Sequence, residues 1–147
     1  MDTETIEKRK QFWTERLREN DYRLTAARCV VIEVLAASEC AITPTEIYDL
    51  ARQEYEKLGL VTVYRTLEKL EDLELVMRVH RPDNCHAFIA GFEGHQHLLL
   101  CRRCGRVAYF SGDNIDNLIQ RVEKESGYKV HDHWLQLFGL CEECAKE

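Results

Sequence analysis

The chain has 147 residues, of which 45% are hydrophobic and 31% charged, and its formal net charge is −6. This apolar content suffices for the packed cores of one domain or two small ones. The longest strongly apolar run, Leu98–Leu100, is far too short to cross a bilayer, and the charged N-terminus lacks the apolar stretch of a secretion signal. We therefore expect a cytoplasmic protein with reduced cysteines and no membrane partner.

A basic segment near the N-terminus departs from the acidic average. Residues 8–28 hold seven basic side chains and only three acidic ones, an excess of four positive charges. Such a strip could face the phosphates of a nucleic acid. A solvated amphipathic helix face explains the charge equally well, so the expected helices must decide between the two interpretations.

Four helices are expected in the first half of the chain, because hydrophobic residues recur there at helical spacing. They cover residues 5–20, a stretch that begins at Thr25, a stretch that begins at Pro44, and residues 60–73. The third helix has a strong start: Thr43 can cap it, Pro44 takes the first helical position, and Glu46 can complete a capping box.

The fourth helix has the pattern of a helix that reads DNA. One apolar stripe faces inward, and Thr62, Tyr64 and Arg65 lie off that stripe near its N-terminal end. A short capped helix, a connection and a second helix of this kind are the layout of a helix-turn-helix, whose second helix enters the major groove. Residues 75–80 and 86–90 then have the pattern of a two-stranded wing.

Two Cys-x-x-Cys pairs, Cys101/Cys104 and Cys141/Cys144, occupy the last third of the chain. Four thiolates in two close pairs are what a closed tetrahedral Zn²⁺ site requires. The 36 residues between the pairs leave room for a strand, a helix and another strand. Two disulfides or a redox Cys-x-x-Cys are the alternatives, and a reducing compartment disfavours the disulfides. We predict a structural zinc site.

The hydrophobic pattern changes after residue 94. Strands are expected over 95–100 and 106–110, a helix over 114–126, and a long last strand over 128–138 that returns the second cysteine pair to the first. The part of the chain after residue 94 is small and buries too little surface to be stable alone. We therefore expect it to need zinc and a partner subunit.

These elements predict an α+β protein, in which a winged helix-turn-helix is followed by a small α/β unit with the four-cysteine zinc site.

Three motifs carry a resemblance to a known family. They are residues 23–28 (RLTAAR), residues 59–67 (GLVTVYRTL), and His95-Gln96-His97 followed by the first cysteine pair. In this order, across nearly the whole chain, they resemble the ferric uptake regulator superfamily. The resemblance implies a homodimeric, metal-dependent transcriptional repressor, not an enzyme, and without a small-molecule substrate. It also implies three parts, which are a winged-helix DNA-binding domain (1–83), a hinge (84–94), and a small α/β dimerisation domain with the four-cysteine zinc site (95–147).

The resemblance also implies contacts with double-stranded DNA. Tyr64 and Arg65 would contact bases, Arg65 through a bidentate pair with guanine and Tyr64 through a thymine methyl group. A two-fold dimer implies a palindromic operator. The candidate DNA-binding residues, including those expected at the DNA backbone, are Tyr64, Arg65, Thr62, Arg23, Arg28 and Lys10.

A second, regulatory metal site is expected in the C-terminal part. His95 and His97 are two residues apart on an expected strand, so both imidazoles point to one face. The family spacing adds Asp116 and His133. Imidazoles with a carboxylate suit Zn²⁺ or Fe²⁺ and do not choose between them. An ordinary surface or core histidine is the alternative for each residue taken alone.

The chain departs from the family at the site that usually senses metal between the two domains. Ala41, Gln96 and Leu98 stand where many members carry histidines. Either that site is absent, or it is rebuilt from residues of the wing and hinge. The residues available for such a rebuilt site are His80, Cys85 and His86.

The hinge sequence favours zinc as the sensed metal. The run Cys85-His86-Ala87-Phe88 resembles the hinge of some zinc uptake regulators. A cysteine thiolate is a soft ligand and favours zinc over iron. We therefore expect a zinc-responsive repressor, with iron or manganese sensing as the alternative. Cys85 as an ordinary buried hinge cysteine is an equally good interpretation.

Two further functions are weighed against this one. A peroxide sensor of the same superfamily would oxidise at an iron-bound histidine or at thiols, and Cys29 and Cys40 lie outside the four-cysteine site. A hydrolytic metalloenzyme around the histidines would need a pocket and a general base. The sequence has neither an HExxH motif nor a Gly-rich phosphate loop, which disfavours that enzyme.

Overall fold

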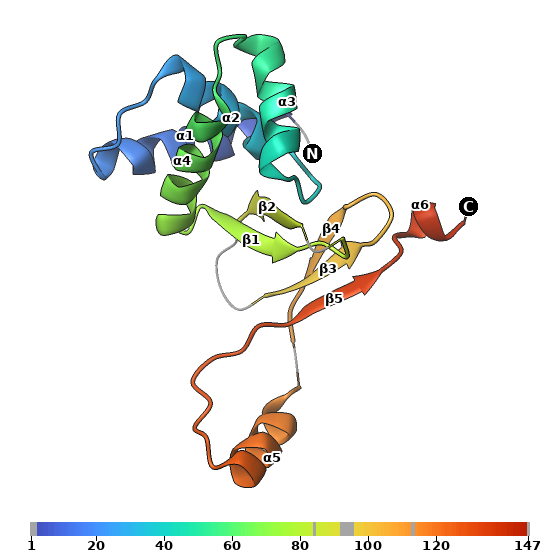
Figure 1. Cartoon of the computed structure of the whole chain (residues 1–147). Helices are drawn as coiled ribbons and strands as arrows, with labels where there is room; N and C mark the ends of the chain where they lie inside the picture. The colour runs from blue at the N-terminus through green and yellow to red at the C-terminus, as the bar shows by residue number, and fades with distance from the viewer. Residues whose placement is uncertain (1–2, 84, 92–95, 113, 147) are drawn as a thin grey trace.

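The computed structural model describes residues 3–83, 85–91, 96–112 and 114–146. Figure 1 shows helices α1–α4 grouped at one end, α5 at the other, and two small sheets between them. In chain order the elements are α1 (Thr3–Glu19), α2 (Ala26–Ala37), α3 (Pro44–Glu54), α4 (Leu60–Asp72), β1 (Val76–His80), β2 (His86–Ala90), β3 (His97–Cys101), β4 (Val107–Phe110), α5 (Asp116–Ser126), β5 (Gln136–Gly139) and α6 (Glu142–Ala145).

Local signals start the N-terminal helices where the sequence predicts. The Thr25 hydroxyl accepts a hydrogen bond from the Arg28 N–H and so caps α2. Thr43 and Glu46 form a complete capping box ahead of α3, with Pro44 as its first residue. The helices enclose one apolar core, whose fully buried members include Leu17, Val31, Ile32, Ile47, Val63 and Leu70.

The wing follows directly after α4. Strands β1 and β2 pair antiparallel in a register that runs from Val76 opposite Ala90 to His80 opposite His86. Phe88 on β2 also exchanges two backbone hydrogen bonds with Ile42, which precedes α3. The wing is thereby attached to the helix-turn-helix, and the predicted winged helix and α+β class are confirmed.

A second, three-stranded sheet has the order β4-β3-β5, with β4 antiparallel and β5 parallel to β3. The prediction of a long last strand over 128–138 is wrong, because only Gln136–Gly139 is a strand. Pairing with β3 begins where Leu98 lies opposite Gln136. Residues 128–135 are not in a strand, because strand formation depends on a paired neighbour more than on local sequence.

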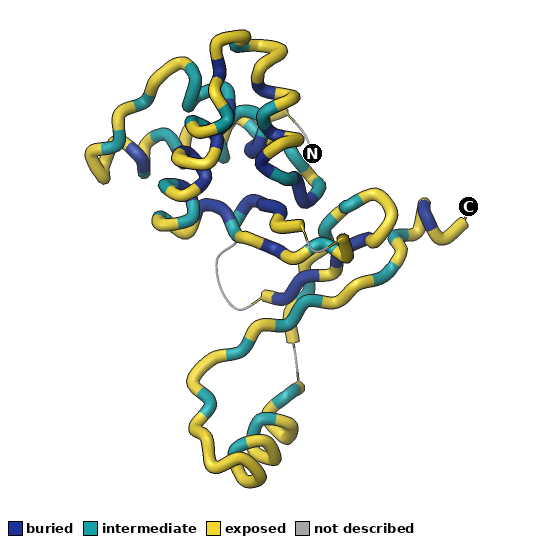
Figure 2. The backbone as a smooth tube through the Cα atoms, viewed as in Figure 1, coloured by how far each residue is buried: buried dark blue, intermediate teal, exposed yellow. Residues whose placement is uncertain are grey.

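The back of the wing packs on one face of this sheet. Figure 2 shows buried residues continuing from the helices through the wing to β3. This junction cluster consists of Ala41, Val79, Ala87, Ile89, Leu98 and Leu100. None of the helices in the described part of the chain is long and apolar enough to cross a membrane.

Candidate metal centre and DNA-binding surface

The four predicted zinc ligands meet in space. One sulfur from each of Cys101, Cys104, Cys141 and Cys144 lies within 4.8 Å of the others, and the Cys104 and Cys141 sulfurs are 3.7 Å apart. Cys101 ends β3 and Cys104 follows in a tight turn, whereas Cys141 caps the start of α6 and Cys144 lies within that helix. Within the described residues this is the sole group of three or more metal-binding side chains.

Backbone geometry holds the two cysteine turns together. Gly105 adopts a φ of +73°, a conformation that glycine takes readily, and its N–H donates to the Cys101 carbonyl at 3.0 Å. The Arg103 guanidinium donates to the Cys144 carbonyl at 3.0 Å, which ties the first turn to α6. The turn that sequence spacing predicts is therefore formed and anchored.

The electrostatics of this cluster suit a cation. Backbone N–H groups of Cys104 and Cys141 donate to the Cys101 sulfur and lower the pKa of that thiol to about 6. Burial raises the pKa of Cys144 to about 12, and hydrogen bonds to the neighbouring sulfurs add to that rise. Four thiolates this close repel one another unless a soft divalent cation lies between them, so the donor set fits Zn²⁺.

The histidine site is only partly assembled. The His97 and His133 rings lie with centroids 5.3 Å apart, and His97 is buried. His95 falls outside the described residues. Asp116 is exposed at the start of α5, which lies apart from the sheet in Figure 1. Of the described residues of this set, His97 and His133 lie together, and Asp116 does not join them in a group of three.

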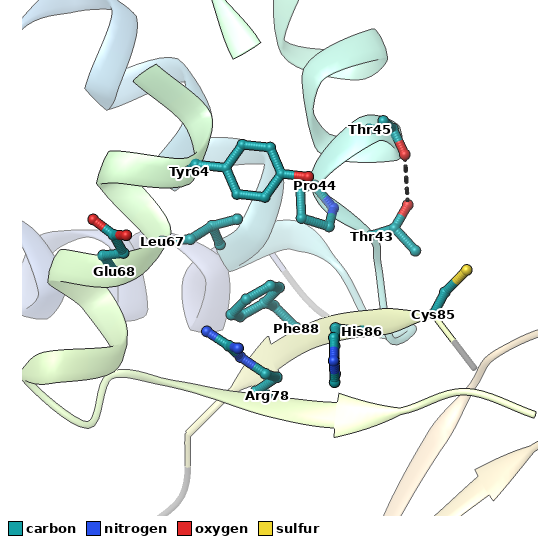
Figure 3. A pocket seen from close by; sticks show the side chains of 10 residues that line it. All are labelled: Thr43, Pro44, Thr45, Tyr64, Leu67, Glu68, Arg78, Cys85, His86 and Phe88. Carbon is teal, nitrogen blue, oxygen red and sulfur yellow. Dashed lines mark hydrogen bonds between the residues drawn. The ribbon is translucent and has the colours of Figure 1, made fainter. Parts of the chain in front are cut away.

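The hinge residues also form a pair rather than a triad. His80 and His86 are opposite each other in the wing, with ring centroids 5.1 Å apart. Cys85 is exposed rather than buried, and Figure 3 shows its sulfur pointing away from the His86 ring. Ala41 and Leu98, at positions where many family members carry histidines, are buried in the junction cluster.

Three of the predicted DNA-binding residues lie on α4. Tyr64 and Arg65 are exposed, whereas Thr62 is half-buried near the N-terminus of the helix. Tyr64 lies beside a cavity of about 470 Å³ between α3, α4 and the wing (Figure 3). The hydroxyl end of its ring points toward Pro44 in that view. This surface offers an aromatic ring and a guanidinium to a groove of DNA.

Part of the basic strip is neutralised within the chain. Lys10 pairs with Glu33 at 2.5 Å, and this contact raises the pKa of Lys10. Lys8 likewise pairs with Glu4 and Arg16 with Glu19. The Arg28 guanidinium donates to the carbonyl of Arg23, while Arg23 itself is exposed. Arg23 is therefore better placed than Lys10 to meet a phosphate.

Two functional candidates were not found from sequence. The Arg81 guanidinium donates to both carboxylate oxygens of Glu46 at 3.0 Å and so joins the wing to α3. Cys40 lies beside the cysteine cluster, where burial and the neighbouring Cys104 thiol raise its pKa. Both contacts join residues far apart in sequence, so local patterns carry no signal for them.

The model of the Ferric uptake regulator family matches residues 19–138. The chain belongs to this family. The ferric uptake regulation protein of Bacillus subtilis is 30% identical over 134 residues, 88% of this chain and 90% of that protein. The peroxide-responsive repressor PerR of Staphylococcus saprophyticus is 27% identical over 141 residues, 96% of this chain and 95% of that protein.

A solved structure extends the comparison to three dimensions. A zinc-bound manganese uptake regulator has a TM-score of 0.66 and 29% identity, with 87% of this chain and 97% of that chain covered. This ferric uptake regulator family member is a metal-responsive, DNA-binding transcription regulator and not an enzyme, as the sequence motifs predict. The hydrolytic alternative is thereby excluded.

Proposed function

We propose that this family member is a zinc-responsive repressor that binds a palindromic operator as a homodimer. The four-cysteine cluster is the observation that carries the proposal, because its sulfurs already lie within 4.8 Å of one another. A structural Zn²⁺ held there would fix the end of β3 against α6. The zinc-bound relative of 29% identity supports this choice of metal.

The homodimer is supported by apolar surface that no other part of the described chain covers. Leu118 and Val122 on α5 are 48% and 42% exposed, and no residue of α5 is buried. Leu99 on β3 and Leu137 on β5 are opposite each other in the sheet and are also largely exposed. A second subunit would remove these side chains from water, at about 25 cal/mol per Å² of apolar area.

Val122→Asp tests this dimer surface. A buried carboxylate in the interface should shift the protein toward monomer, because an unpaired charge there is costly. Analytical ultracentrifugation reports the shift, and Glu125→Asp, exposed on the same helix, is the matched control. Equal dimer content in both variants would contradict the proposed interface.

Regulation requires a second metal whose ligands lie near the wing and the sheet. His97 and His133 supply one pair of imidazoles, with His95 and Asp116 as further candidates. His80 and His86 supply another pair, beside Cys85. Gln136 on β5 donates to the His80 carbonyl at 2.8 Å, so the wing and the sheet already share a contact that a bound ion would strengthen.

A bound ion would act by population shift. It would favour the arrangement in which the two α4 helices of the dimer match the half-site spacing of the operator. Changing such an equilibrium from 1:99 to 99:1 takes about 5.5 kcal/mol of differential binding. Structural zinc sites provide about 10 to 16 kcal/mol, so one zinc ion suffices.

The decisive experiment measures the metal content of the purified protein and then duplex-DNA binding with added Zn²⁺, Fe²⁺ or Mn²⁺ under anaerobic conditions. We expect one tightly held zinc per chain and a further rise in binding that is specific to Zn²⁺. Cys85→Ala and His97→Ala, each compared with Cys29→Ser, locate the regulatory site.

Other outcomes favour the other members of the family. Equal responses to Fe²⁺ or Mn²⁺, unaffected by Cys85→Ala, would move sensing to the His97 and His133 site and reject zinc specificity. Loss of DNA binding when the iron-loaded protein meets peroxide would instead favour a peroxide sensor, the function named for the relative of 27% identity.

A further inference from the structure

A fifth cysteine lies next to the metal centre. Cys40, in the connection between α2 and α3, forms an isolated antiparallel bridge with Arg106. The pairing continues on both sides, since Ala41 N–H donates to the Gly105 carbonyl at 2.9 Å and Val107 N–H to the Glu39 carbonyl at 3.3 Å. The connection ahead of the helix-turn-helix therefore runs along the first cysteine turn.

This pairing brings Cys40 close to the first cysteine turn. Cys104 lies in the turn that leads into Arg106, the bridge partner of Cys40. Both cysteines line one cavity of about 440 Å³. A Cβ atom built on Gly105, beside Cys104, would lie 3.8 Å from the Cys40 Cβ.

The four ligands differ in exposure. Cys101 and Cys144 are buried and Cys141 is half-buried, but Cys104 is exposed. Cys104 is therefore the ligand that oxidants and alkylating agents reach first. Arg81 and Arg103 line the same cavity.

We infer that Cys40 is a reserve ligand of the metal centre, which completes a four-sulfur set when Cys104 leaves it. The inference rests on the proposed zinc. In the exchange the Cys40 thiol gives its proton to solvent, its sulfur–zinc bond forms, and the bond from Cys104 breaks, so no electrons are transferred. The ion then ties the α2–α3 connection directly to the C-terminal sheet.

Cobalt substitution tests the exchange, because sulfur-to-cobalt charge-transfer absorption reports the number of thiolate ligands. The variants are Cys104→Ser alone, with Cys40→Ser, and with Cys29→Ser, which removes another free, half-buried cysteine. We expect Cys104→Ser to keep one metal ion and the four-sulfur spectrum, as should its combination with Cys29→Ser. The combination with Cys40→Ser should fall to three sulfurs and lose zinc to a chelator.

Identical spectra and zinc retention for Cys104→Ser with and without Cys40→Ser would overturn the inference alone. Wild-type protein that holds no zinc would overturn the proposed centre and this inference together. Should Cys104→Ser fail to fold, zinc-loaded wild-type protein is treated with a limiting amount of iodoacetamide, which alkylates the exposed Cys104 and releases iodide. Mass spectrometry should find protein alkylated at Cys104 that keeps its zinc and protects Cys40 from further alkylation; loss of zinc on that alkylation would count against the inference.

Discussion

Arg65 is exposed on α4, while its neighbour Thr66 is fully buried and donates its hydroxyl hydrogen to the Thr62 carbonyl at 2.7 Å. Thr66 thus anchors the helix to the core, and Arg65 remains available to contact DNA. Thr62 is held through its backbone, so only its half-buried side chain is available to DNA. Base recognition is therefore expected to depend mainly on Tyr64 and Arg65.

Arg65→Ala should lower the preference for the operator over unrelated DNA, since one bidentate contact with a base discriminates by about 1 to 3 kcal/mol. Competition binding against operator variants measures this preference at fixed salt. Arg121→Ala, an exposed arginine on the distant α5, removes the same charge and should leave the preference unchanged. An Arg65→Ala protein with unaltered operator preference would remove Arg65 from the recognition surface.

At the scale of elements, one ion pair joins the wing to the helix-turn-helix. Burial opposes ionisation of Glu46, but hydrogen bonds from Thr43 and Arg81 outweigh it and lower the pKa of Glu46. A lowered pKa in the folded state stabilises the protein above the ordinary glutamate pKa of 4.5. That stability is lost as the pH falls below this value, through the lower pKa of the folded state.

Glu46→Gln should therefore cost up to about 1 kcal/mol near neutral pH, since the pair is partly exposed and glutamine can still serve the capping box. The cost should diminish as the pH falls below the ordinary glutamate range. Denaturant unfolding at several pH values measures it. Glu71→Gln, which removes a comparable pair with Arg78 that does not involve α3, is the control. A pH-independent difference would mean that the charge of Glu46 is irrelevant.

Elements defined by local sequence are the ones that could be predicted. Thr43, Pro44 and Glu46 specify the start of α3 by themselves, and the spacing within each cysteine pair specifies the metal centre. The start of the last strand could not be predicted, because it depends on where β3 offers partners. Cys40 likewise reaches the centre only through its pairing with Arg106, more than sixty residues away. Such tertiary pairings leave no periodic signal.

At the scale of the whole molecule, two separate apolar cores share the wing. Phe88 on β2 packs with the helices, whereas its neighbours Ala87 and Ile89 pack in the junction cluster against Leu98 and Leu100. Alternate residues of β2 therefore connect helices α1–α4 to the sheet that carries the metal centre. A displacement of the sheet should therefore move the wing as well, through the packed side chains of the junction cluster.

Removal of the structural metal should consequently affect the two halves unequally. A strong chelator is expected to release the sheet and α6, since zinc sites of this type contribute about 10 to 16 kcal/mol. Helices α1–α4 should persist, because their core contains no residue of that sheet. Amide exchange by mass spectrometry would show protection lost over residues 96–146 and kept in α2 and α4. Uniform loss of protection would indicate a single cooperative unit.

The parallel pairing of β3 with β5 should also affect the order of folding. Short connections join β1 to β2 and β3 to β4, whereas β5 reaches β3 only after an excursion of more than thirty residues that includes α5. Closing so long a loop costs conformational entropy, which is offset only after the contacts between the strands have formed. Such pairings therefore form slowly. In a newly made chain, helices α1–α4 and the wing should therefore be folded while one edge of β3 is still unpaired. Metal bound by the two cysteine pairs would bring β5 to that edge quickly and so protect the chain from aggregation between unpaired strands.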